Sequence, residues 1–188
     1  MLFRTRRTFL AAMAVTGLLA AGTGLLLSPA GAAPAGSLAA ARQAMVDRAV
    51  QEAAPAFAAW IIATRDTLAD GALPPPPGMQ ALLAGYFPPE LLARVRYRVG
   101  WPSGAAGAAF RLSNARAATI DRVIVFRDRE IAADPVIWAH ELAHVRQFET
   151  WGVAGFASRY LRDRAGVEAE AWDVATTYKM WALAAGRL

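Results

Sequence analysis

The amino-acid sequence predicts an α+β fold that is mostly helical, with a small sheet and a metal site between two helices. Residues 136–150 contain no helix-breaking residue and carry two histidines at helical spacing. In residues 166–183, apolar side chains recur at spacings of three and four, which is typical of one buried face of a long helix. Residues 94–99 and 121–127 have the alternation and composition of short strands.

The first helix carries both histidines of the chain, His140 and His144, four residues apart. Side chains at this spacing project from one face of a helix, one turn apart. Two neutral imidazoles in this arrangement can bind one zinc ion. Glu141 follows the first histidine, so we expect it to reach a water on the metal and act as a general base.

The boundaries of this helix are also marked in the sequence. Asp134 is a good N-cap, Pro135 suits the first helical position, and Gly152 is a natural stop. The alternative is an ordinary helix whose two histidines have no ligand role. That alternative is disfavoured because apolar neighbours such as Leu142 and Val145 are typical of a buried site helix.

A zinc site needs a third protein ligand, which here has to be an aspartate or a glutamate because no histidine or cysteine remains. The acidic cluster on the last helix is the best source. Within it, Glu168 and Glu170 are about 200° apart around the helix, so both cannot face one metal. The apolar face favours Glu170 weakly, and the residues alone leave the choice open.

The N-terminus is predicted to be a targeting segment. Residues 1–32 combine a basic start, an apolar run from Phe9 to Leu27 and an Ala30-Gly31-Ala32 cleavage site. The pair Arg6-Arg7 resembles the twin-arginine export signal. We therefore expect an exported bacterial protein, periplasmic or secreted, that touches a membrane only if the leader stays uncleaved.

The length and the net charge of the chain limit its domain organisation and the kinds of partner that it can bind. The 188 residues suggest a leader followed by a single domain, residues 33–188. Three of the five net positive charges come from the leader, and the rest of the chain has no arginine or lysine stripe with interleaved aromatics, so we expect no nucleic-acid partner.

In the rest of the domain we expect a helix over 38–69 that Pro55 kinks or splits, and short helices over 79–84 and 89–93. We also expect a loop over 100–107 and a turn over 131–134.

The two metal-site segments resemble those of gluzincins, zinc metallopeptidases with His-Glu-x-x-His on one helix and a glutamate on a later one. In that clan the later helix often reads Glu-x-x-Ala-Asp, and its first Glu is the ligand. The segment Glu168 to Trp172 matches the Glu and the Ala, so the resemblance implies Glu168 as third ligand. Trp172 replaces the acid that would orient a ligand histidine.

More narrowly, the segment His140 to Gln147 resembles a bacterial domain-of-unknown-function family of predicted peptidases with the pattern His-Glu-Leu-x-His-x-x-Gln. Members of this family occur as small exported proteins and beside contractile-injection-system cargo. The resemblance covers about residues 92–185 and implies a zincin-like core there. Gln147 is either a hydrogen-bonding partner of the site or an ordinary helix-packing residue, and Tyr160 and Tyr178 are candidate oxyanion donors, with core packing as their alternative.

The resulting hypothesis is an exported zinc metallopeptidase that acts on a peptide or protein substrate. One Zn²⁺ per chain would be held by His140, His144 and Glu168, with Glu141 as the general base. The alternative is a catalytically silent, zinc-stabilised binding or assembly module. The sequence specifies neither the substrate nor an oligomeric state.

Overall fold

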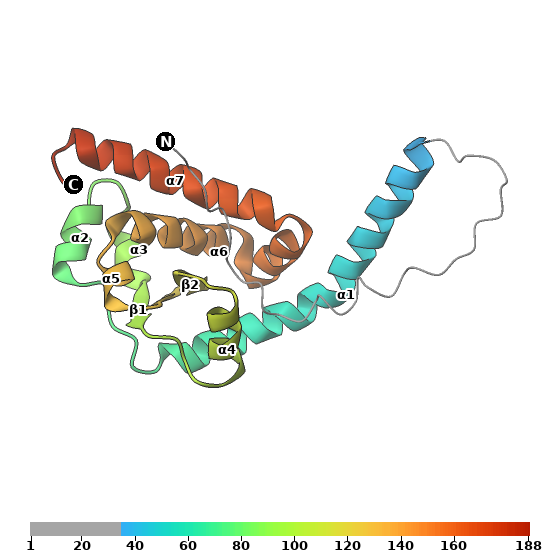
Figure 1. Ribbon diagram of the computed structural model, residues 1–188, viewed down its shortest axis with the longest axis horizontal. Helices are drawn as coiled ribbons and strands as arrows, with labels where there is room; N and C mark the ends of the chain where they lie inside the picture. The colour runs from blue at the N-terminus through green and yellow to red at the C-terminus, as the bar shows by residue number, and fades with distance from the viewer. Residues whose placement is uncertain (1–34) are drawn as a thin grey trace.

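The computed structural model describes residues 35–188 as seven helices and three strands (Figure 1). The predicted signal peptide, residues 1–32, lies outside the described residues. The elements in chain order are α1 Ala35–Ala69, α2 Pro77–Leu83, α3 Pro89–Arg94, β1 Arg96–Val99, α4 Gly104–Leu112, β2 Ala117–Ile120, β3 Val123–Phe126, α5 Arg129–Ala132, α6 Pro135–Arg162 and α7 Arg164–Ala184. The predicted α+β class, mostly helical with a small sheet, is therefore confirmed.

The sheet has three strands in the order β1-β3-β2. β3 pairs in parallel with β1, with Arg96 opposite Val123, and antiparallel with β2, with Ala117 opposite Phe126. Alternate residues of β3 enter two different cores: Ile124 lies in the core beside the first half of α6, and Val125 lies in the core beside α1 and α4. The sheet is therefore buried on both faces, and this fixes its position against α6.

Helix α6 lies between the sheet and α7 (Figure 1). It contacts α7 along one side and contacts α1 and β2 on others. The C-terminal half of α1 passes beneath the domain, whereas its N-terminal half projects away from it (Figure 1). This layering brings α7, the helix with the acidic cluster, against the helix that carries both histidines. Within residues 35–188, no helix is both long and apolar enough to cross a membrane.

Several sequence expectations need correction. Residues 100–107 are not all loop, because α4 begins at Gly104; its alanines favour a helix, and Phe110 anchors it in the core at 1 % exposure. Strand β2 was not expected, since its four small or β-branched residues are too few to show a pattern. Pro55 does not split the first helix, which runs continuously through it and bends in its middle part (Figure 1). The expected turn over 131–134 is only partly correct, because residues 131–132 belong to a short helix, α5, whose N-cap is Asp128, and only residues 133–134 connect it to α6.

Candidate metal centre

The helix of the histidines begins where the sequence predicts. Asp134 Oδ1 accepts hydrogen bonds from the backbone N–H groups of Val136, at 2.9 Å, and Ile137, at 3.4 Å. Pro135 occupies the first helical position. Because these contacts satisfy N–H groups that have no partner within the helix, they fix the start of α6 and hence the direction in which its later residues project.

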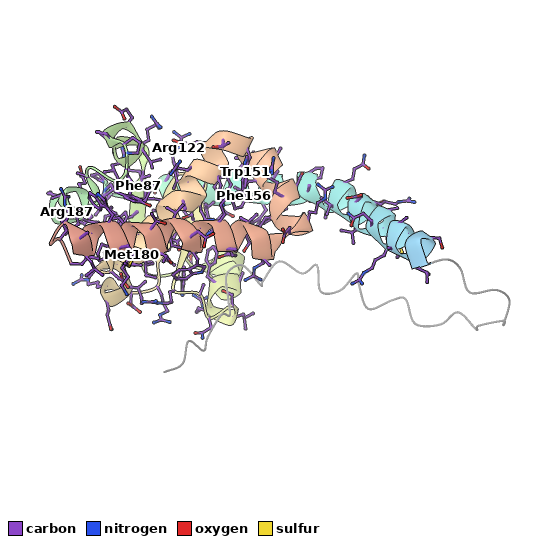
Figure 2. All side chains as sticks on the ribbon, turned by 90° about the horizontal axis from the view of Figure 1, so that it is seen from above. Phe87, Arg122, Trp151, Phe156, Met180 and Arg187 are labelled. Carbon is purple, nitrogen blue, oxygen red and sulfur yellow. The ribbon has the colours of Figure 1, made fainter. Side chains whose placement is uncertain are left out.

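Gly152 divides α6 into two helical parts. Its backbone angles, φ 66° and ψ 168°, are non-helical and lie in a region that residues with a side chain rarely adopt. The second part turns back, so that the ring of Phe156 stacks on Phe148 with centroids 3.8 Å apart and packs near Trp151 (Figure 2). The predicted stop at Gly152 is therefore a change of direction, and it brings Tyr160 toward the site.

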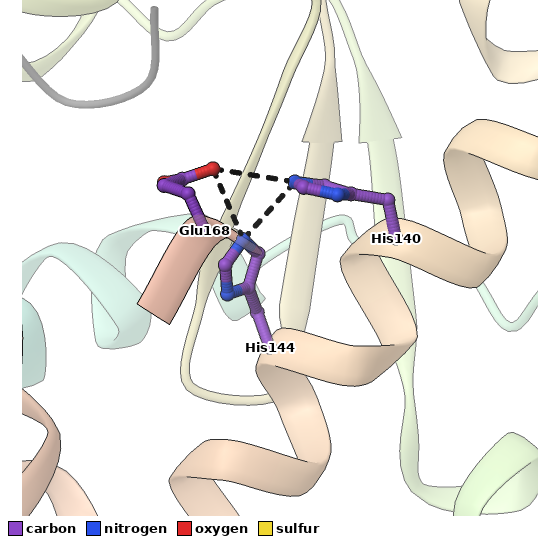
Figure 3. Close-up of side chains that lie close together, drawn as sticks. All are labelled: His140, His144 and Glu168. Atoms are coloured by element: carbon purple, nitrogen blue, oxygen red, sulfur yellow. Dashed lines mark hydrogen bonds and ion pairs between the residues drawn. The ribbon is translucent and has the colours of Figure 1, made fainter. Parts of the chain in front are cut away.

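The structure places His140, His144 and Glu168 together (Figure 3). The Nε2 atoms of the two histidines lie 3.2 Å apart. Glu168 Oε2 lies 3.5 Å from His140 Nε2 and 3.8 Å from His144 Nε2. A circle through these three atoms has a radius of about 2.0 Å, which equals the usual length of a zinc bond to imidazole nitrogen or carboxylate oxygen. The three side chains could therefore hold a metal ion.

Glu170, the other candidate for third ligand, has a different partner. Its Oε2 accepts a hydrogen bond of 2.8 Å from Gln147 Nε2, and Gln147 Oε1 lies 2.8 Å from His144 Nδ1. The two glutamates of α7 thus reach the site from different sides, as their angular separation requires. Glu168 faces the histidine nitrogens, and Glu170 contacts the residue that supports one of them.

The carboxylate of Glu168 has a second contact. Tyr160 donates a hydrogen bond of 3.0 Å to its Oε1. Burial by itself raises the pKa of Glu168, but the adjacent imidazoles of His140 and His144 outweigh burial and hold that pKa well below its usual range. Conversely, burial alone would lower the pKa of His144, but the neighbouring Glu168 raises it above its ordinary value.

Glu141, the predicted general base, is buried at 2 % exposure and contacts the sheet. The hydroxyl of Thr119 on β2 lies 2.7 Å from its Oε2 and 3.1 Å from its backbone carbonyl oxygen. Burial raises the pKa of this carboxyl, more than the neighbouring histidines and Thr119 lower it. A raised pKa suits a group that must both take up and release a proton.

His140 is held differently from His144. Its Nδ1 is buried and has no hydrogen-bond partner among residues 35–188. The ring of Trp172, which is 44 % exposed, packs against the imidazole with centroids 4.3 Å apart. Trp172 stands at the position where the gluzincin resemblance implies an orienting acid. An aromatic contact here replaces a hydrogen bond.

The structure separates the two tyrosine candidates. Tyr178 lies in the core against Tyr86 and Phe87, and its hydroxyl donates to the carbonyl of Leu82 at 3.3 Å, so it has the contacts of a core residue. Tyr160 contacts Glu168 instead. The sequence did not indicate Thr119, because strand β2 itself was not predicted and a single threonine carries no pattern.

Two facing helices that bring together two histidines and a glutamate define a mostly helical α+β protein with a candidate metal centre. The eCIS core domain family matches residues 74–152. This match covers less than half of the chain and supports the contractile-injection-system core-domain family that the segment 140–147 resembles. The matched segment contains His140, Glu141 and His144 but ends before Glu168. Neither a curated protein nor a solved structure matched the chain.

Proposed function

We propose that this protein is a zinc-dependent hydrolase of peptide bonds. The observation that carries the proposal is the convergence of His140 Nε2, His144 Nε2 and Glu168 Oε2 around one point at zinc-ligand distance, with Glu141 next in sequence to the first ligand. Two histidines and one glutamate are a ligand set of catalytic zinc sites, which keep a position open for water or substrate.

In the proposed reaction, bound zinc would supply a Lewis acid that polarises the peptide carbonyl and makes water more acidic. Glu141 takes a proton from the attacking water and passes it to the leaving amine. Thr119 holds Oε2 of that carboxylate at 2.7 Å and so restricts its orientation. Glu168 faces the histidines with Oε2, while Tyr160 engages Oε1 and restrains the carboxylate.

The proposal is tested with the Glu141→Gln variant, which keeps the shape of the side chain but removes the base. Peptide-library cleavage by the full chain should fall by about 10²–10⁴-fold, the usual contribution of a general base, while zinc content measured by mass spectrometry stays at one per chain. The matched control is Glu149→Gln, which changes an exposed glutamate of the same helix that pairs with Arg94. Equal cleavage by Glu141→Gln and the parent would contradict the mechanism.

A second candidate is a catalytically silent module that zinc stabilises for binding or assembly. One observation favours it: His140, Glu141 and His144 are only 3 %, 2 % and 2 % exposed. In that case zinc would raise the melting temperature, His140→Ala would remove this effect, and a zinc-loaded parent protein would cleave no member of the library. Cleavage by the parent that is lost in Glu141→Gln would favour the hydrolase over the silent module.

We also propose that the protein is exported after removal of its leader. The supporting feature is the order of basic, apolar and small residues in 1–32. Intact-mass measurement on protein from the producing cell should give an N-terminus near Ala33. Replacement of Arg6 and Arg7 by lysine should block export if the twin-arginine route is used. A mature protein that still begins at Met1 would contradict leader cleavage.

A further inference from the structure

Gln147 contacts three groups with one buried amide. Its Oε1 lies 2.8 Å from His144 Nδ1, and its Nε2 donates to the backbone carbonyl of Val167 at 3.1 Å and to Glu170 Oε2 at 2.8 Å. The side chain is nearly inaccessible, with the residue 6 % exposed. Gln147 therefore joins the helix of the histidines to the helix that supplies the third ligand candidate, Glu168.

These contacts determine which nitrogen of His144 carries a hydrogen. The carbonyl of Val167 can only accept a hydrogen bond, so the NH₂ group of Gln147 has to face it and its oxygen has to face His144. An amide oxygen also only accepts, so Nδ1 of His144 has to be the donor. In the neutral imidazole, Nε2 then carries the free electron pair, and this atom lies beside His140 Nε2 and Glu168 Oε2.

We propose that Gln147 and Glu170 form a positioning pair that sets His144 as a metal ligand. Gln147 acts directly by fixing the tautomer and ring orientation of His144. Glu170 acts through Gln147, because its carboxylate holds the amide in the orientation that presents the oxygen. The proposal rests on the metal site of the proposed function and is independent of whether that site hydrolyses peptides.

The positioning pair also explains why α7 carries two glutamates that cannot face the same point. Glu168 and Glu170 are about 200° apart around α7, and each contacts a different part of the His144 environment. Seating α7 against α6 thus brings in the third ligand and orients the second histidine at the same time. His140 has no such support, since its Nδ1 has no partner in the described part of the chain.

The experiment compares zinc affinity of the full chain by competition with a chelator, in four variants. Gln147→Leu removes both hydrogen-bonding functions and should weaken zinc binding by about 10–100-fold, as loss of a ligand's supporting partner does. Gln147→Glu places a second carboxylate against Glu170, so it should weaken zinc binding by at least about 10-fold. The control, Glu149→Gln, should bind as the parent does.

The decisive variant is the exchange Gln147→Glu with Glu170→Gln. In this protein the new glutamate accepts from His144 Nδ1–H and the new glutamine donates to it, whereas the carbonyl of Val167 loses its donor. Zinc affinity should therefore rise clearly above that of Gln147→Glu without fully reaching that of the parent. Such rescue indicates coupling between the two positions. Affinity no better than that of Gln147→Glu alone would overturn the pairing, as would parental affinity in Gln147→Leu.

A second measurement needs neither zinc nor activity. Long-range ¹H–¹⁵N correlation spectra of the metal-free, ¹⁵N-labelled chain at alkaline pH identify the hydrogen-bearing nitrogen of each neutral imidazole. We expect Nδ1–H for His144 in the parent and in Glu149→Gln, and a mixture of tautomers in Gln147→Leu. An Nε2–H tautomer in the parent would overturn the inference. A parent that binds zinc and shows Nδ1–H but cleaves no peptide would contradict the proposed hydrolase and leave the positioning pair supported.

Discussion

Tyr160 donates a hydrogen bond to Oε1 of Glu168, whereas the other oxygen of that carboxylate, Oε2, faces both histidines. Tyr160 reaches this position because the chain changes direction at Gly152, between the two parts of α6. The stacking of Phe156 on Phe148 holds the second part in place. The geometry of a ligand candidate on α7 therefore depends on one backbone conformation in α6.

This dependence predicts the effect of Gly152→Ala. No heavy atom lies within 4 Å of the position of an added Cβ, so the cost is conformational rather than steric. A residue with a side chain at φ 66° should destabilise the fold by about 1–3 kcal/mol, measured by denaturant unfolding, and should weaken zinc binding. The control is Gly78→Ala, which also has open space but an ordinary φ and lies in helix α2. An unchanged Gly152→Ala protein would contradict the argument.

The ligand assignment predicts a graded series on α7. Glu168→Gln removes the carboxylate that faces the two histidines and should abolish tight zinc binding, as should His140→Ala or His144→Ala. Glu170→Gln should retain measurable binding, because Val167 still orients the amide of Gln147. Asp173→Asn, on an exposed part of the same helix, serves as the control. Isothermal titration with zinc distinguishes these outcomes, and loss of binding in Glu170→Gln but not in Glu168→Gln would reverse the assignment.

The sequence was sufficient for the parts of the site that depend on helical geometry. The spacing of His140 and His144 requires only that α6 is a helix, and the caps at Asp134 and Pro135 place its start. It could not decide between Glu168 and Glu170 from the residues, since that choice depends on how α7 rotates against α6. The resemblance to gluzincins pointed to Glu168, the residue that the structure places beside the histidines.

The contacts around the ligands were harder to predict, because they join segments far apart in the sequence. Thr119 reaches Glu141 only because β2 lies against α6. The sequence allows Gln147 either a site role or a packing role, because its partners Val167 and Glu170 come from α7. Such contacts follow from the packing of helices and sheet, which no periodic pattern in one segment specifies.

The pKa shifts predict how zinc binding depends on pH. Glu168 raises the pKa of His144 above its ordinary value of 6.5 in the metal-free protein, so a proton has to leave His144 before zinc binds. Zinc affinity should therefore increase with pH and level off only above 6.5. Glu168 itself, with a lowered pKa, stays deprotonated over this range.

This pH dependence is checked by nuclear magnetic resonance titration of His144 in the metal-free protein. In Glu168→Gln, the pKa of His144 should fall, because the Glu168 carboxylate is lost and only the smaller effects of Glu141 and Gln147 then oppose burial. The zinc-binding profile of the parent gives the second measurement. A His144 pKa that does not change in Glu168→Gln would show that another group controls it.

Trp172 allows a test in which metal binding should improve. His140 Nδ1 is buried without a hydrogen-bond partner in residues 35–188, so a carboxylate placed beside it can accept a hydrogen bond from Nδ1–H. Trp172→Asp puts an acid at the position where the gluzincin pattern has one, within the environment of the His140 ring. Since partners of this kind change metal affinity by about 10–100-fold, we expect tighter zinc binding, measured by chelator competition.

The other Trp172 variants separate the aromatic contact from the hydrogen bond. Trp172→Phe keeps a ring against His140 and should bind zinc nearly as the parent does, whereas Trp172→Ala removes the support and should bind more weakly. Removing a ring that is 44 % exposed should cost less stability than removing a core aromatic residue, so thermal unfolding of each metal-free variant shows whether the fold is intact. If Trp172→Asp is folded but binds no tighter than Trp172→Ala, the unpaired Nδ1 does not limit metal affinity. If Trp172→Asp binds zinc more tightly than the parent, Trp172 holds the His140 ring in place but leaves it a weaker metal ligand than a hydrogen-bonded histidine.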